Sequence, residues 1–309
     1  MLPVGQCLQF TPARKVTPGR ARHRTGPGVR QRGWASTDNA GTPDYQGRIL
    51  PRNRQGVQEE SAHVRIFALT SSQVNPNRDP DDPVVAWGYD GLGAPQHWGS
   101  LSDEYATCSE GKQQSPIDIG MCRQVEDASI AFSYTVAATE VRSDGIFFHI
   151  DFPPGNALTI GHRIYQLHTA HFHVPSEHRR NGRSYAAELH LVHQDAAGNL
   201  AVVGQWFALG APSALVRAVL EVVEVGFTPA DGLALDAGSF LPDQPGYYRY
   251  DGSRTTPPCD EPVEWYVMRH PKTISADQVD NLLELSGGPN NRPVQPLGGR
   301  SVVLGVQTA

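Results

Sequence analysis

Two short stretches, His171-Phe172-His173 and Glu188-Leu189-His190, carry most of the information in this sequence about fold and function. The alternation of polar with apolar residues predicts β-strands, in which side chains two residues apart lie on one face. His171 and His173 can therefore present two imidazoles to one ion, and His190 can add a third from a neighbouring antiparallel strand. Three neutral nitrogens and an open fourth position are typical of a catalytic zinc site, whereas structural sites have four protein ligands.

Oxygen-bearing side chains near these histidines favour a catalytic centre. Glu188 lies two residues before His190 on the same strand face, where it can accept the far N–H of a ligand imidazole and fix its orientation. Glu177 and Thr255 offer a second pair, in which a carboxylate holds a hydroxyl. A zinc-bound hydroxide needs such a hydroxyl in order to present its lone pair to an electrophile.

Histidine and charge are both unevenly distributed along the 309 residues. Eight of the 12 histidines lie between His149 and His193, which indicates a metal or proton-handling site. Residues 1–83 contain 12 Lys and Arg against 7 Asp and Glu, whereas residues 84–309 contain 14 against 25 and have a net charge of −11. The acidic part argues against a nucleic-acid partner, because binding to a phosphate backbone needs a basic surface.

The change in composition near residue 84 predicts two parts. Residues 1–83 are basic, then rich in Pro, Asn and Asp, and are expected to be a disordered extension, presequence or linker. They contain no clear signal peptide at Met1, and no run in the chain approaches the 18 or so apolar residues of a membrane-spanning helix. Residues 84–309 are expected to form the catalytic domain.

This second part is predicted to be mainly β (α+β), with a few short surface helices. Alternating runs bounded by Gly, Pro and Asn turns predict strands at 147–152, 157–160, 163–173, 185–193, 200–209 and 263–269. One helix is expected after Pro212, and another is expected to begin with a capping box formed by Ser275 and Gln278.

A different metal-binding fold also fits part of the pattern. In cupin barrels, the motif H-x-H followed four residues later by a glutamate uses that glutamate, here Glu177, as a metal ligand. The same motif requires glycine at the positions that Tyr165 and Ser184 occupy in this chain. Both mismatches count against a cupin.

Seven segments between about Trp87 and Val303 occur together in one known family, in the same order. They are Trp87-Gly88-Tyr89, Gln96-His97-Trp98, Gln113-Gln114-Ser115-Pro116-Ile117-Asp118-Ile119, His171-Phe172-His173-Val174-Pro175-Ser176-Glu177-His178, Tyr185-Ala186-Ala187-Glu188-Leu189-His190-Leu191-Val192-His193, Gly252-Ser253-Arg254-Thr255-Thr256-Pro257-Pro258 and Arg292-Pro293-Val294-Gln295-Pro296-Leu297. Through them the chain resembles the alpha-class carbonic anhydrases of bacterial and algal type. The basic N-terminal part contributes nothing to the resemblance.

The resemblance implies a central, largely antiparallel ten-stranded twisted sheet. It also implies a zinc lyase (carbonate dehydratase) that reversibly hydrates carbon dioxide to bicarbonate and a proton through zinc-bound hydroxide. The zinc ligands would be the three histidines named above, with Glu188 behind the third. Thr255 matches the hydroxyl that orients the hydroxide, and Glu177 matches the carboxylate behind that hydroxyl.

The resemblance further implies a small-molecule substrate pocket, in a monomer or homodimer. The pocket positions are Val192, Val202, Val263 and Trp265, which match the apolar wall for carbon dioxide, together with Thr256 and Arg254. Arg254 replaces the leucine that usually precedes the orienting threonine. Its guanidinium could narrow the apolar mouth or extend into solvent.

Two further departures concern proton transfer and the first histidine. The family's proton-shuttling histidine corresponds to Ile146, which cannot carry a proton, so transfer is expected to be slower or to run through His149. Thr169 replaces a glutamine two residues before His171, and the missing amide weakens one contact to that ligand or to the substrate. A zinc protein of this fold with poor catalysis, acting as a binding module, is the alternative, although none of the three histidines is lost.

The four cysteines bear on the cellular compartment. The resemblance to bacterial and algal members implies a disulfide between Cys108 and Cys259, while Cys7 and Cys122 have no evident partners. A disulfide indicates an oxidising compartment, such as the periplasm, the extracellular space or an organelle lumen.

Overall fold

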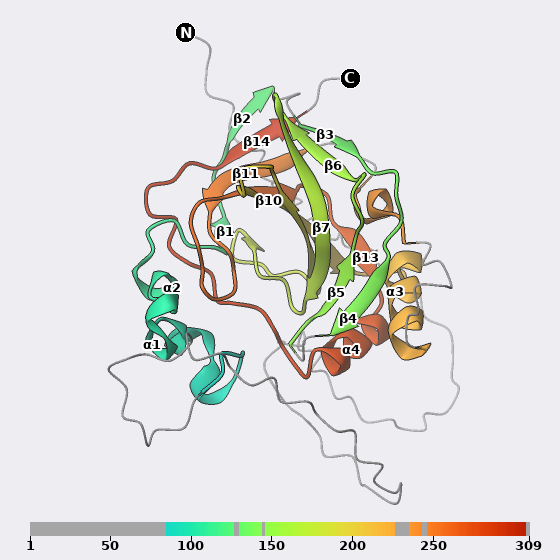
Figure 1. Cartoon of the computed structure of the whole chain (residues 1–309), viewed down its shortest axis with the longest axis horizontal. Coiled ribbons are helices and arrows are strands. Elements are labelled where there is room, and N and C mark those ends of the chain that lie inside the picture. The colour runs from blue at the N-terminus through green and yellow to red at the C-terminus, as the bar shows by residue number, and fades with distance from the viewer. Residues whose placement is uncertain (1–84, 127–129, 144–145, 226–234, 243–245, 307–309) are drawn as a thin grey trace, which may run out of the picture. The chain divides into compact units, whose positions relative to one another are not determined.

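The computed structural model describes residues 85–126, 130–143, 146–225, 235–242 and 246–306 (Figure 1). The extension predicted over residues 1–83 lies outside the described residues, as does Cys7. Within the described ranges, no helix is both long and apolar enough to cross a membrane.

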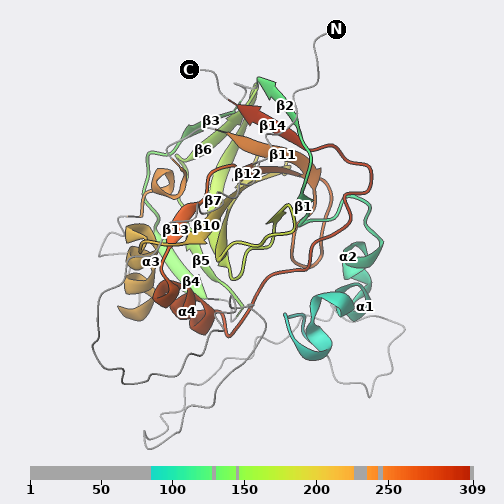
Figure 2. The same cartoon turned by 180° about the vertical axis from the view of Figure 1, so that it is seen from behind.

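A large twisted sheet forms the centre of the described domain (Figures 1 and 2). Its twelve described strands follow the order β2-β14-β11-β12-β10-β9-β7-β5-β4, with β3, β6 and β13 paired beside this path. Most neighbours are antiparallel, whereas the pairs β10–β12, β10–β13 and β14–β2 are parallel. The mainly β fold class and the largely antiparallel sheet are confirmed, with twelve strands where ten were expected.

The strand bounds are β2 Arg123–Glu126, β3 Ile130–Ser133, β4 Glu140–Ser143, β5 Phe148–Asp151, β6 Ala157–Ile160, β7 Arg163–His173, β9 Ala187–Gln194, β10 Leu200–Leu209, β11 Tyr247–Gly252, β12 Val263–Met268, β13 Lys272–Ile274 and β14 Val303–Val306. A separate two-stranded sheet joins β1 Asp118–Ile119 to β8 Arg179–Arg180. The expected ranges coincide with β6, β7 and β10, and they differ by a few residues at the ends of β5, β9 and β12. The long strand β7 pairs with two strands along one side. Its first half pairs with β6 and its second half pairs with β5, which increases the number of strands in the sheet.

Alternating side chains along the central strands separate the two faces of the sheet. On β9, Leu189 and Leu191 enter the larger hydrophobic core, so Glu188 and His190 point to the opposite face. On β7, Phe172 belongs to the same core, which turns the histidines on either side of it to the face of His190. The register of the two strands, and not the fold class alone, therefore gathers the three histidines.

Two helices, α3 Ala214–Val225 and α4 Ala276–Leu285, cover the face that these histidines do not occupy (Figures 1 and 2). Val216 of α3 and Leu282 of α4 are fully buried in the larger core. The predicted capping box is present at α4, where the side chains of Ser275 and Gln278 each accept the other residue's backbone N–H.

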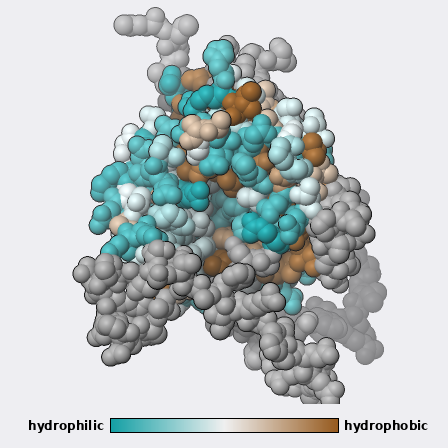
Figure 3. All heavy atoms as spheres, in the orientation of Figure 1, coloured by the Kyte–Doolittle hydropathy of each residue, from teal (hydrophilic) through white to brown (hydrophobic). Residues whose placement is uncertain are grey.

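Short helical turns precede the sheet. They are η2 Gly91–Gly93, η3 Pro95–His97, α1 Trp98–Leu101, η4 Asp103–Tyr105 and α2 Thr107–Glu110, and a later turn is η6 Ala237–Phe240. Trp98 packs with Cys108 and Cys259, and Trp87 and Tyr89 pack against this group. We call these five residues the N-terminal aromatic cluster. The coloured surface in Figure 3 is mainly hydrophilic with scattered apolar residues, as is ordinary for a folded domain.

Candidate metal centre

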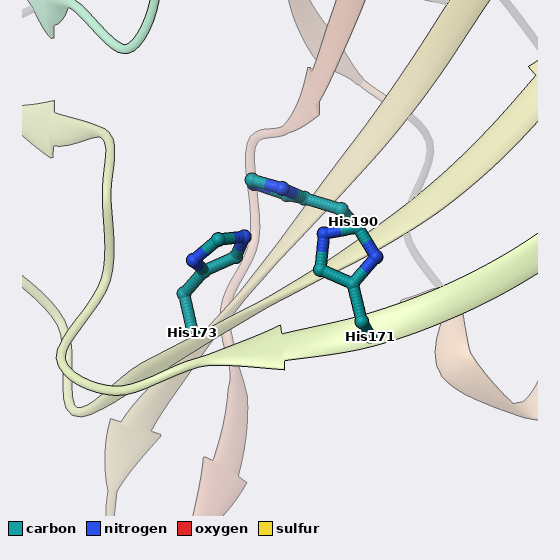
Figure 4. A group of neighbouring side chains, drawn as sticks. All are labelled: His171, His173 and His190. Atoms are coloured by element: carbon teal, nitrogen blue, oxygen red, sulfur yellow. The ribbon is translucent and has the colours of Figure 1, made fainter. Parts of the chain in front are cut away.

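Three histidine rings converge on one face of the sheet (Figure 4). His171 on β7 lies directly opposite His190 on β9, and His173 follows two residues later on β7. One ring nitrogen from each residue lies within 4.8 Å of the other two. His173 and His190 are buried and His171 is half-buried, so the group is enclosed with one partly open side. Such an arrangement can hold a metal ion while leaving a position for a further ligand.

Hydrogen bonds decide which nitrogen two of these rings present. The Nδ1 of His173 lies 2.7 Å from the carbonyl oxygen of Asn290, which can only accept, so Nδ1 carries the proton and Nε2 keeps its lone pair. That Nε2 is buried and has no hydrogen-bond partner among the described residues. The Nε2 of His190 lies 3.1 Å from the carboxylate of Glu188, which leaves the lone pair of His190 on Nδ1.

Burial keeps the three rings uncharged. It lowers the pKa of His171 and of His173 well below the ordinary histidine value, and the neighbouring imidazoles lower both further. Burial also lowers the pKa of His190, although hydrogen bonding to Glu188 opposes the shift. Neutral imidazoles are the form that binds a metal, so the ring chemistry fits a divalent cation.

A second group, His178, Glu188 and His190, also brings three potential ligand atoms together. Its contacts are hydrogen bonds, because the Nδ1 of His178 lies only 2.7 Å from the Oε1 of Glu188. Two ligands of one tetrahedral zinc would lie about 3.3 Å apart, given zinc–ligand distances near 2.0 Å. Burial alone would raise the pKa of Glu188, but the nearby His178 and the hydrogen bonds from the rings of His178 and His190 hold it well below its ordinary value. The carboxylate thus supports the third histidine.

Glu177 and Thr255 meet beside the histidines although they are 78 positions apart in the numbering. Glu177 is 1% exposed, and its Oε1 accepts the backbone N–H of Arg292 at 2.8 Å. Burial raises the pKa of Glu177 well above its ordinary value, and hydrogen bonding from the Thr255 hydroxyl opposes this shift. Its Oε2 lies 3.9 Å from the Nδ1 of His190, and Glu177 belongs to neither group of potential ligands.

The expected disulfide between Cys108 and Cys259 is present and spans 151 positions of the sequence. Both cysteines are buried in the N-terminal aromatic cluster. Because Cys259 follows Thr255 by four residues, the bond ties the loop that carries this hydroxyl to the N-terminal segment.

Residues 93–305 match the family model of the eukaryotic-type carbonic anhydrases. The chain belongs to the alpha carbonic anhydrase family. A carbonic anhydrase of Pectobacterium carotovorum is 34% identical over 71% of this chain and 91% of its own length. The alpha-carbonic anhydrase of Thermovibrio ammonificans, solved with the inhibitor sulfanilamide, is 38% identical with a TM-score of 0.66, over 71% of this chain and 98% of that one. Dioscorin dioA3 of Dioscorea japonica is 35% identical over 67% of this chain and 81% of its own length.

Membership of the carbonic anhydrases assigns the chain to a family of lyases and, in general terms, to hydration of the small molecule carbon dioxide. It also rules out the cupin alternative.

The four apolar residues predicted to line the substrate pocket lie near one another beside His190. Val192 and Val202 are directly opposite on β9 and β10, and Val202 is opposite Trp265 on β12. Val263 is buried in the same hydrophobic cluster. The ring centroids of Trp265 and His190 are 4.8 Å apart, so the apolar surface continues to the three histidines.

The residues that flank Thr255 lie in the loop after β11. The side chain of Arg254 is 46% exposed, and its Nε lies 4.0 Å from the Oδ2 of Asp260. Of the two orientations expected for this guanidinium, the structure thus has the one that extends into solvent. Thr256 is half-buried, and its carbonyl oxygen accepts the N–H of Cys259 at 2.9 Å.

The residues considered for proton transfer lie at the start of β5. His149 is directly opposite His171, with ring centroids 5.7 Å apart, so it faces the same side of the sheet as the three convergent histidines. His149 is half-buried, as is Ile146 three residues earlier. Thr169, two residues before His171, is half-buried on the same face, and its hydroxyl has no hydrogen-bond partner in the described part of the chain.

Three contributors to the centre were not singled out from the sequence. Asn290 supplies the carbonyl that orients His173, and Arg292 supplies the N–H that holds Glu177. Tyr250 places its hydroxyl 2.6 Å from the Nε2 of His178 and thereby extends the polar network behind Glu188. The first two contacts are made by backbone atoms, for which a sequence has no residue-specific signal.

Proposed function

We propose that residues 84–309 form a zinc-dependent carbonic anhydrase domain that reversibly converts carbon dioxide and water to bicarbonate and a proton. The observation that carries the proposal is the convergence of three neutral ring nitrogens, from His171, His173 and His190, beside a paired hydroxyl and carboxylate. All-nitrogen donor sets suit zinc, and a bound zinc ion would make a water molecule nucleophilic near neutral pH, an effect for which carbonic anhydrase itself is the standard example.

The chain's own residues orient the reactants. We assign to Thr255 an O–H donated to Glu177, in line with its effect on the pKa of that carboxyl, so that its oxygen would be left to accept a hydrogen bond from the attacking water. The Arg292 N–H holds Glu177 in place, at 2.8 Å from Oε1. The charge of a bound cation would lower the pKa of this buried carboxyl and favour its acceptor form.

The apolar wall supplies the place for carbon dioxide. Val202, Val263 and Trp265 are at most 6% exposed and offer no hydrogen-bonding group apart from the indole N–H, which donates to the Ser253 carbonyl at 2.9 Å. A surface of this kind excludes competing water and accepts an apolar molecule without desolvating a polar group. We assign Thr256 to the outer part of this pocket, from which the Arg254 guanidinium extends into solvent towards Asp260.

The proton released by the reaction is proposed to leave by way of His149. Ile146 has no group that can carry a proton, whereas His149 lies across the strand pair from His171. Because the Cys108–Cys259 disulfide is present, we further propose that the domain works in an oxidising compartment. We also propose that it is a monomer or homodimer.

The test combines metal analysis with stopped-flow measurement of carbon dioxide hydration. We expect one zinc per chain and hydration well above the buffer rate, both abolished in His190→Ala. Stoichiometric zinc without hydration would refute the proposal and favour a zinc protein of this fold that acts as a binding module.

A further inference from the structure

The ring of Phe147 lies between the N-terminal aromatic cluster and the metal histidines. Its centroid is 5.1 Å from that of His171 and 5.2 Å from that of His173. On its other side it meets Trp87 at 6.5 Å and Tyr89 at 6.0 Å. At 5% exposed, it is enclosed by these neighbours.

His171 differs from the other two histidines in its polar contacts. Its Nδ1 points away from the other two rings in Figure 4, is buried, and has no hydrogen-bond partner within the described residues. The buried hydroxyl of Thr169, two residues earlier on the same face, is also without one. Residues i and i+2 of a strand are about 6.6 Å apart, a gap that the short threonine side chain does not span.

A histidine ring without a hydrogen bond needs another restraint. Rotation about the bond that joins Cβ to the imidazole has only a broad intrinsic preference, so surrounding groups must set the ring angle. For His173 and His190, the Asn290 carbonyl and the Glu188 carboxylate do this. The Nδ1 of His171 has no such partner among the described residues. Of the described rings that lie against His171 outside the three histidines, Phe147 is nearest, with centroids 5.1 Å apart, and His149 follows at 5.7 Å.

Phe147 is itself firmly placed. Trp87 and Tyr89 pack edge-on against Trp98, with ring centroids 5.7 and 5.6 Å away. The indole N–H of Trp98 donates to the carbonyl oxygens of Gly88 and Gly93, each at 2.9 Å. A continuous set of rings thus leads from the N-terminal segment to the first metal ligand.

We propose that Phe147 is a positioning residue for the metal: its ring, held by the N-terminal aromatic cluster, sets the orientation of His171 in place of the hydrogen bond that this ligand lacks. The inference rests on the proposed zinc site and assigns Phe147 no contact with substrate.

The test compares Phe147→Leu with Phe148→Leu as the matched control. Phe148 is the next residue, is 4% exposed, and packs on Phe172 in the larger core on the opposite face of the sheet. Zinc affinity is measured by chelator competition, the ligand geometry by the visible spectrum of the cobalt-substituted protein, and folding by urea unfolding of the metal-free protein.

We expect Phe147→Leu to weaken zinc binding by about 10- to 100-fold, the range typical of removing a residue that orients a metal ligand. Its cobalt spectrum should change, whereas Phe148→Leu should bind zinc within about threefold of the parent protein and keep its spectrum. Adding Thr169→Gln to Phe147→Leu should restore affinity, because the longer amide can reach Nδ1 of His171.

Equal zinc affinity in Phe147→Leu and the parent protein, equal weakening in Phe148→Leu, or no rescue by Thr169→Gln would overturn the positioning role. If Phe147→Leu does not fold, Phe147→Met with the same readouts replaces it. A parent protein that binds no stoichiometric zinc would instead refute the proposed function, so the two failures are distinguishable.

Discussion

Replacing Glu188 with glutamine tests how the polar network supports the third histidine. The carboxylate is fully buried and accepts three hydrogen bonds. Its Oε2 accepts the backbone N–H of His178 at 2.8 Å, and its Oε1 meets the ring N–H groups of His178 at 2.7 Å and of His190 at 3.1 Å. Glutamine keeps the size and shape but has only one acceptor oxygen.

Glu188→Gln lowers the unfolding free energy because it weakens or removes the three hydrogen bonds that the carboxylate accepts. With the amide oxygen at the Oε1 position, both ring bonds survive in weaker, uncharged form, and the NH2 group faces the backbone N–H of His178. One charge-assisted bond, worth about 1.5–3 kcal/mol, is lost, and the two remaining bonds are roughly halved. Together these losses predict a decrease of about 3–6 kcal/mol in unfolding free energy. The alternative flip, with the NH2 group towards the rings, would force His190 to protonate Nδ1, the atom it offers to a metal.

The assay is urea unfolding of the metal-free protein together with zinc affinity from chelator competition. We expect Glu188→Gln to weaken zinc binding by about 10- to 100-fold. Glu264→Gln is the control, because Glu264 accepts contacts from Arg163 at 2.6 Å, Tyr165 at 3.0 Å and Tyr266 at 3.2 Å, and belongs to neither group of potential metal ligands. The reasoning is refuted if Glu188→Gln costs less than about 1 kcal/mol, or if both variants weaken zinc binding equally.

Three further outcomes are expected. Thr255→Val should lower hydration about 100-fold or more with zinc content unchanged, whereas Thr256→Val should have a small effect, and equal effects would contradict the orienting role of Thr255. Burial lowers the pKa of His193 from 6.5 to about 3. Between these two pH values, His193 is protonated in the unfolded chain but stays neutral in the folded protein. The unfolding free energy therefore falls as pH drops from 6.5 towards 3, by up to about 4–5 kcal/mol. In metal-free protein, His193→Gln should remove this part of the pH dependence. If the unfolding free energies of the variant and the parent protein change equally with pH, the role of His193 is contradicted. Small imidazole buffers should accelerate hydration, and Ile146→His should reduce that acceleration; a rate independent of buffer concentration would mean that proton transfer is not limiting.

Local sequence patterns predicted much of the fold because they reflect local geometry. The period of two along 163–173 gave β7 with its observed bounds, and the capping box at Ser275 placed the start of α4. The ends of β9 were less accurate: Tyr185 and Ala186 were included in the strand, but Ala187 is its first residue. The additional sheet strands are short pieces of three or four residues, such as β13 and β3, in which alternation is too brief to recognise.

In the candidate site too, local spacing predicted some features and long-range strand pairing decided others. The spacing of His171 and His173 by itself placed both imidazoles on one strand face, because the strand period is two. The antiparallel register that sets His190 opposite His171 comes from long-range pairing of β7 with β9.

Sequence by itself determined the mainly β class, the identity of the three convergent histidines and the chemistry of their carboxylate and hydroxyl neighbours. Only the tertiary structure decided how each ring is held: by the Asn290 carbonyl, 117 residues from His173, by the Glu188 carboxylate, and for His171 by packing against Phe147. The physical reason is that every residue has a backbone carbonyl, so the sequence does not mark the one that accepts a hydrogen bond. Ring packing likewise depends on how closely folding brings two side chains together. Neither has a fixed spacing in sequence, so each exists only once the chain has folded.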